Sequence, residues 1–301
     1  MSAPWRSGVR PVGDRCFQHR EITTAKEFEM SVFPTPQPIT ATLTTAGARV
    51  RVTASERLDT VVLVEPIDAA SKSDVKVAES TKVGFDGGTL SIETKKAGGK
   101  NGSVAITVEV PTGSQLVLNT AWSEVSADGQ FGDCALEVSS GQVRIDRVAA
   151  VRGNLAAGEI AIGHVAGTVD LEGGSAGVRI GDVEGTVKYS GATGKVWIGH
   201  ARSGVDLSGS SGSFDIDRAD GDVVAQAANC PIRVGRLSRG EAELTNASGG
   251  IEVGVVGDAA SVDAKSTKGS VRNSFATDNG EGGVKVYART RLDDIVIHRA
   301  A

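Results

Sequence analysis

Apolar residues recur along most of this chain with a period of about eighteen residues. Between residues 118 and 275 a short run of alternating apolar and polar residues returns eight or nine times. The apolar residues at equivalent positions are separated by 18, 17, 18, 18, 18, 18, 19 and 20 residues: Val125, Val143, Ile160, Val178, Val196, Phe214, Ile232, Ile251 and Val271. A fixed short period is typical of a solenoid, in which each repeat forms one coil and stacks on the next.

The alternation within each repeat predicts a strand with one buried side. Val196 and Ile198 flank Trp197, so the two aliphatic side chains should point to the same side of the strand. Stacked coils would align such residues into two inner columns, with glycines at the corners where the chain turns sharply. The first predicted column runs from Val143 to Ile251, and the second contains Ile145, Ile162, Ile180, Ile198, Ile216, Val234 and Val253.

This pattern predicts an all-β fold, a parallel β-helix-like solenoid of about eight 18-residue coils over residues 116–275. Residues 30–115 lack the strict repeat and are expected to form an irregular β cap at the N-terminal end. Alternation predicts strands there over Ile39–Leu43, Arg49–Ala54, Thr60–Val64, Thr89–Glu93 and Val104–Val110, with a helical turn or two over Ser73–Ser80. Residues 276–301 should hold a linker and two strands, Val284–Ala288 and Asp294–His298, that close the C-terminal end.

Residues 1–29 are polar, irregular and unlike the rest of the chain. We expect a disordered extension there, and the change in texture at Met30 suggests the hypothesis that Met30 is the natural start. No hydrophobic segment typical of a secretory signal precedes it, and no apolar run approaches about 18 residues. These features predict a cytoplasmic protein. The alternative is a protein that reaches the cell surface by an unconventional export route.

Composition limits the classes of partner and cofactor that we expect. A formal net charge of −5 provides no basic field, so neither nucleic acid nor a membrane is an expected partner. The three cysteines, Cys16, Cys134 and Cys230, are far apart and show no metal-ligand spacing. No cofactor is expected.

Two short motifs resemble catalytic or metal-binding sequences. Gly173–Gly177 reads G-x-S-x-G, but it lies at a repeat corner and is followed by a strand, whereas a nucleophile elbow requires a helix. Asp215–Asp222 resembles a calcium loop, but the spacing is wrong and no closing glutamate follows. We therefore interpret the first as a corner and the second as solvated acids, and expect no enzyme.

The candidate interaction surface is a column of charged residues just beyond the inner strand: Arg147, His164, Asp182, His200, Arg218 and Arg236. Three interpretations stay open: cross-strand ion pairs, a surface for an anionic glycan or a protein, or a metal held by the two histidines and Asp182. Trp197 should face solvent beside Asp215 and Arg233 and joins this surface. A sugar-stacking platform would use aromatic residues: Trp122, Tyr189, Trp197 and Phe214.

The repeats resemble a bacterial family of β-strand-repeat proteins catalogued as putative adhesins, a domain of unknown function. The segments that carry the resemblance are GEIAIGHVAGTVDL, GKVWIGHARSGVDL and CPIRVGRLSRGEAELTNASGGIEVGV, and the opening MSVFPTPQPITATL resembles an actinobacterial branch without a signal. The resemblance spans about residues 30–298. It implies a right-handed β-helix-like solenoid and an adhesin-like, non-enzymatic role, with no catalytic residues.

The sequence thus favours a non-enzymatic binding or scaffold protein whose partner is an unknown protein or glycan. A carbohydrate-active β-helix enzyme is the first alternative. The second is a self-assembling structural protein, a homo-oligomer formed through the solenoid ends.

Overall fold

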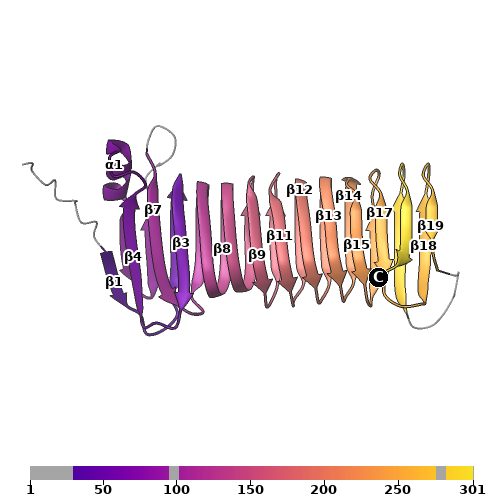
Figure 1. Ribbon diagram of the computed structural model, residues 1–301, viewed down its shortest axis with the longest axis horizontal. Coiled ribbons are helices and arrows are strands. Elements are labelled where there is room, and N and C mark those ends of the chain that lie inside the picture. Colours follow the sequence, from indigo (N-terminus) through magenta and orange to yellow (C-terminus); the bar gives the residue numbers. More distant parts are fainter. Residues whose placement is uncertain (1–29, 95–101, 276–282, 301) are drawn as a thin grey trace, which may run out of the picture.

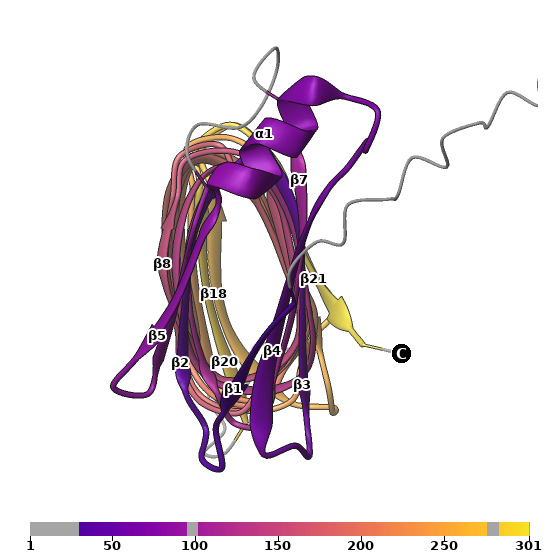
Figure 2. The same ribbon diagram turned by 90° about the vertical axis from the view of Figure 1, so that its left-hand side faces the viewer.

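The computed structural model describes residues 30–94, 102–275 and 283–300. The predicted N-terminal extension and most of the predicted linker therefore lie outside the described residues. The described chain forms an elongated, flattened tube of strands, seen from the side in Figure 1 and along its axis in Figure 2. It is an all-β solenoid with a single short helix among the described residues. That helix is too short and too polar to cross a membrane.

Two walls of parallel strands build the tube. Face A contains β2, β6, β10 and the first residues of β12, and face B contains β3, β7, β9, β11 and the last residues of β12. Some strands run through a corner from one face to the other, as β12 does by pairing with β10 over its first residues and with β11 over its last. The elements on the N-terminal side are β1 (Met30–Pro34), β2 (Thr40–Ala46), β3 (Ala48–Ser55), β4 (Asp59–Pro66), α1 (Lys72–Ser80), β5 (Lys82–Asp86), β6 (Thr89–Glu93), β7 (Val104–Pro111) and β8 (Gln115–Leu155). The remaining strands are β9 (Glu159–Val165), β10 (Val169–Gly173), β11 (Gly177–Val183), β12 (Val187–Ala201), β13 (Val205–Ala219), β14 (Val223–Asn229), β15 (Ile232–Leu237), β16 (Glu241–Thr245), β17 (Ile251–Val255), β18 (Ala260–Ser266), β19 (Val271–Asn273), β20 (Val284–Thr290) and β21 (Ile295–Arg299).

Strand pairing confirms the predicted repeat. Val196 pairs with Val178 on one side and with Phe214 on the other, each one coil away. Both predicted inner columns are buried, with Val196 at 1% and Ile198 at 0% exposure. Each coil therefore contributes its aliphatic side chains to one continuous core that runs the length of the tube.

The N-terminal end combines regular coils with a cap. Strands β2 and β3 pair in parallel with β8, so the predicted cap region also contributes coils to the solenoid. The antiparallel strands β1, β4 and β5 and the helix α1 cover this end (Figure 1). Phe33 of β1 stacks on Phe85 of β5 with ring centroids 5.2 Å apart, which closes the core between the two faces.

The C-terminal end corrects one prediction. The last two strands form, as β20 and β21, but they do not close the end. Strand β20 lies between β16 and β18, and β21 lies between β17 and β19. Ile295 therefore separates Ile251 from Val271 in the inner column, and the 20-residue step to Val271 is not a step to the adjacent coil. The alternation of residues identifies strands, but it does not specify the order in which strands pair.

Candidate interaction surfaces

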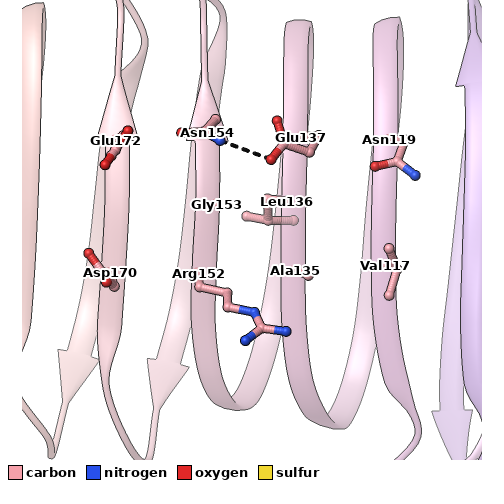
Figure 3. Close-up of a pocket in the computed structure, with 10 residues that line it drawn as sticks. All are labelled: Val117, Asn119, Ala135, Leu136, Glu137, Arg152, Gly153, Asn154, Asp170 and Glu172. Carbon is pink, nitrogen blue, oxygen red and sulfur yellow. Dashed lines mark hydrogen bonds between the residues drawn. The ribbon is translucent and has the colours of Figure 1, made fainter.

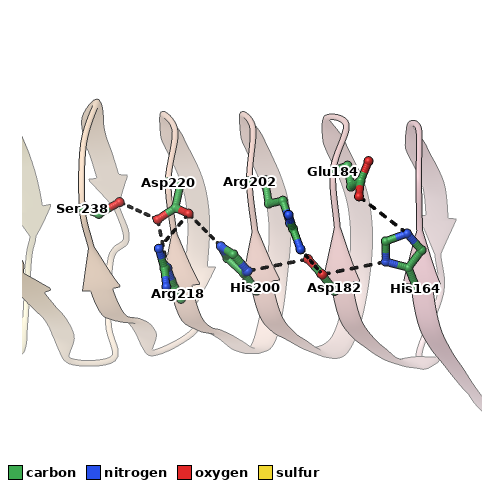
Figure 4. Close-up of polar contacts among 8 residues, drawn as sticks. All are labelled: His164, Asp182, Glu184, His200, Arg202, Arg218, Asp220 and Ser238. Atoms are coloured by element: carbon green, nitrogen blue, oxygen red, sulfur yellow. Dashed lines mark hydrogen bonds and ion pairs between the residues drawn. The ribbon is translucent and has the colours of Figure 1, made fainter.

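The predicted column of charged residues, here called the charge ladder, lies on face B where the strands approach a corner (Figure 4). Consecutive members pair in register: Arg147 with His164, His164 with Asp182, Asp182 with His200, and His200 with Arg218. Arg236 lies on β15 and is exposed. The pairs on either side of it, Ile216 with Val234 and Ala219 with Leu237, keep the same 18-residue offset, so Arg236 lies opposite Arg218. Sequence reasoning therefore placed all six residues in one row, spaced by ~4.8 Å per coil.

Asp182 is the central acceptor of the ladder. Arg202 donates to its two carboxylate oxygens at 3.2 and 2.8 Å. His164 and His200 approach it from the coils on either side, with Nδ1 to carboxylate distances of 3.8 and 3.6 Å. The hydrogen bonds from Arg202 hold the pKa of Asp182 below its usual value, and the histidines add to this effect.

Asp220 forms a second acceptor two coils further along. It accepts hydrogen bonds from Arg218 at 3.0 and 3.1 Å and from Ser238, and it lies 2.7 Å from Nε2 of His200. Burial opposes ionisation of this carboxyl group, but the donors outweigh it and hold the pKa of Asp220 well below its usual range. The two acids therefore stay ionised and bridge neighbouring coils.

These contacts favour the ion-pair interpretation of the ladder. Asp182, Asp220 and both histidines have partners within this chain, and Arg147 lies 3.4 Å from Asp146. No group of three or more histidine, cysteine, aspartate or glutamate residues in the described ranges has a geometry that could hold a metal ion. The ladder consists mainly of ion pairs that join adjacent coils, as expected for cross-strand charge pairs.

Trp197 also lies on face B, but it is only partly exposed. The guanidinium of Arg179 stacks over its ring at 4.9 Å from the centroid. On the next coils, Arg233 binds Asp215 at 2.7 Å and Asp217 at 3.1 Å. The acids of the calcium-like motif thus pair with an arginine of this chain.

Other predicted residues are structural. Tyr189 and Phe214 are each 2% exposed and pack edge to face inside the core, so they cannot form a platform for sugars. Ser175 of the G-x-S-x-G motif lies at the corner between β10 and β11, as the sequence predicts. Its hydroxyl is 3.4 Å from the carbonyl oxygen of Ala156.

Trp122 is a residue that the sequence names only as one of four aromatic candidates. It lies at the corner where β8 passes from face A to face B, and 74% of its surface is exposed. Its backbone is left-handed, with φ of 49°, and Gly47 on the paired coil turns the same corner with φ of 66°. Its amide donates to the hydroxyl of Ser140 at 3.2 Å. A non-glycine residue with this conformation is strained, and such strained residues cluster at functional sites.

A shallow hollow of about 310 Å³ lies beside this corner on face A (Figure 3). The hollow exists because small residues such as Ala135 and Gly153 lie at its base, and Arg152 extends across it toward Ala135 in Figure 3. Its polar lining consists of planar side chains: Asn119, Glu137, Arg152, Asn154, Asp170 and Glu172. Asn154 donates to Glu137 at 2.9 Å, which fixes both side chains.

A search of curated proteins finds no match. Among solved structures, the chain is similar to a "putative adhesin" from Parabacteroides distasonis ATCC 8503, with 13% identity, 90% of this chain and 97% of that chain covered, and a TM-score of 0.39. A "putative adhesin" from Parabacteroides merdae ATCC 43184 is 8% identical, with 90% and 96% covered and a TM-score of 0.36. A "putative lipid binding protein" from Parabacteroides distasonis ATCC 8503 is 13% identical, with 91% and 96% covered and a TM-score of 0.32.

A match to a family model assigns the chain to a protein family. The model described as Toastrack DUF4097 matches residues 41–297, nearly the whole described chain, and this confirms the family resemblance of the repeats. The protein belongs to the Toastrack DUF4097 family.

Proposed function

We propose that the protein is a non-enzymatic binding scaffold whose partner contacts the corner that carries Trp122. The observation that carries this proposal is the combination of 74% exposure and a left-handed backbone at Trp122. Folding explains neither property, because a glycine turns the same corner on the paired coil without strain. Exposed tryptophans are enriched at binding sites because they offer a large, rigid surface with a polar edge.

The charge ladder is a weaker candidate for the contact surface. Its central acids already bind cations of this chain, so a ligand would have to displace Arg202 or Arg218. We assign the ladder to stiffening the stack of coils. A rigid stack would hold Trp122 and the neighbouring hollow in one fixed arrangement, which reduces the entropy that binding must overcome.

The test compares the immobilised wild-type protein with immobilised Trp122→Ala. Each is exposed to the soluble proteins and, separately, to the purified envelope polysaccharides of the cells in which the protein naturally occurs. The proposal expects retention of material from either source by the wild type and its loss with Trp122→Ala. Trp197→Phe is the matched control, because Arg179 stacks over that ring and the residue is only partly exposed. Equal retention by all three proteins would refute the proposal. Release of reducing ends from the polysaccharides would instead support the carbohydrate-active enzyme.

A further inference from the structure

We infer that the Trp122 corner and the hollow on face A together form a binding site for a neutral, hydroxyl-rich polysaccharide. This inference rests on the proposed function and names the class of ligand. The hollow begins at Asn119, three residues before Trp122 on the same strand, so about 10 Å of chain joins them. One extended ligand can therefore contact both.

The surroundings of Trp122 favour a sugar over a protein. Protein interfaces surround a tryptophan anchor with further apolar residues that exclude water. Among the described residues, every other exposed large apolar side chain lies near one of the two ends of the solenoid: Met30, Val32, Leu58, Ile67, Val256, Val271, Tyr287 and Leu292. Trp122 is thus an isolated aromatic surface in polar surroundings. A pyranose ring matches such a surface, because the C–H groups of one ring face can stack on the indole while its hydroxyl groups stay hydrated.

The corner itself offers polar contacts along the axis of the tube. Ser140 lies next to Trp122, and the equivalent corners of later coils carry Ser175, Thr193 and Ser211. Thr193 pairs in register with Ser211, so these hydroxyl groups follow one another at ~4.8 Å per coil. A chain of sugars that runs along this corner would meet a hydrogen-bonding group on most coils.

The hollow adds the groups that recognise sugar hydroxyls. Its lining provides both donors and acceptors, namely the amides of Asn119 and Asn154, the guanidinium of Arg152 and three carboxylates. The three carboxylates are Glu137, Asp170 and Glu172, against one cation, so the hollow carries a formal excess of two negative charges. An anionic polysaccharide would be repelled there. A volume of about 310 Å³ lies at the small end of ligand sites, which suits one or two sugar rings rather than a folded protein.

Affinity electrophoresis tests the inference directly. Native gels containing hydroxyethyl cellulose, dextran or soluble glycol chitin are compared with gels containing alginate or hyaluronate. The inference expects retardation of the wild type by at least one of the neutral polymers and by neither of the anionic ones. Trp122→Ala should weaken the retardation at least about tenfold, because truncation of a tryptophan anchor has effects of this size.

Two further variants separate the parts of the site. Trp122→Phe keeps an aromatic face and should retain part of the affinity, whereas Glu172→Ala should weaken binding through the hollow without touching the corner. Trp197→Phe should bind as the wild type does. Thermal unfolding of each variant establishes that it is folded before its binding is compared.

Three results would overturn the inference: no retardation by any of the neutral polymers, retardation that survives Trp122→Ala, or retardation by the anionic polymers alone. If the first occurs while the wild type, but not Trp122→Ala, retains a cellular protein, the binding scaffold stands and the sugar ligand is wrong. If neither polymer nor protein is retained, both proposals fail.

Discussion

At the scale of single residues, Trp122 shows what alternation along a strand cannot reveal. The sequence named it among the aromatic candidates but gave no reason to prefer it to Trp197, Tyr189 or Phe214. Period-2 alternation distinguishes inward from outward positions only while the strand is regular, and Trp122 lies at a corner with φ of 49°. Its exposure depends on the geometry of the turn, which the paired Gly47 shares.

Replacing Trp122 with glycine should separate stability from binding. The left-handed conformation disfavours a side chain by roughly 1–2 kcal/mol, so glycine removes this strain from the folded state. Glycine also makes the unfolded chain more flexible, which stabilises the unfolded state by only about 0.4–1 kcal/mol. We expect Trp122→Gly to unfold at the same or a slightly higher urea concentration than the wild type. A clear loss of stability in equilibrium urea unfolding would show instead that the indole supports the fold.

The ionised acids of the ladder should make stability depend on pH. The pKa values of Asp182 and Asp220 are lowered in the folded protein, so their contribution is complete above the unfolded value near 3.8 and is lost as pH falls below it. We expect thermal stability to fall steeply below about pH 4 in the wild type and less steeply in Asp220→Asn. Parallel pH profiles for the two proteins would contradict the role given to Asp220.

At the scale of elements, the sequence predicted the strands because burial enforces the alternation. The inner columns and the six members of the ladder follow directly from the repeat, and strand pairing bears them out. The contacts of the ladder were not predictable, because Arg202 and Asp220 belong to the turns after the strands and reach the ladder only through their side chains. The hollow escaped prediction for a related reason, since it depends on small residues that meet across neighbouring coils.

An aspartate in the inner column should unfold the stack. Val196 is 1% exposed, and an unpaired carboxylate at such a site destabilises by about 3–5 kcal/mol. We expect Val196→Asp to lower the urea midpoint strongly and to do so as one transition, because each coil depends on its neighbours. Lys195→Asp is the matched control on the exposed side of the same strand and should shift stability by no more than about 0.5 kcal/mol. Similar midpoints for the two variants would contradict the inward assignment.

At the scale of the whole molecule, both ends of the tube share one arrangement. At the N-terminal end, β2 lies between β6 and β8, and β3 lies between β7 and β8. At the C-terminal end, β20 and β21 likewise lie inside strands that are adjacent to them in the sequence, β18 and β19. The sequence could not predict this order, because the inserted coils have the same alternation as the coils that they separate.

Removal of the inserted C-terminal coil should also release the coil outside it. In the described chain, β18 pairs only with β20 and β19 only with β21. We expect deletion of residues 284–299 to abolish the hydrogen-exchange protection of β18 and β19, while β9 and β11 stay protected. Continued protection of β18 would mean that it can pair directly with β16 instead.

The inserted coils have a consequence for how this protein is made and how it can evolve. A ribosome synthesises residues 260–273 before residues 284–299, yet the earlier segment lies outside the later one. The outer coil must therefore wait for the inner coil to leave the ribosome before either can join the sheet. For the same reason, repeats added beyond the last described strand would find no free place beside it. They would have to pass over the outer coil to reach the outer edges of β18 and β19, which have no partner among the described residues.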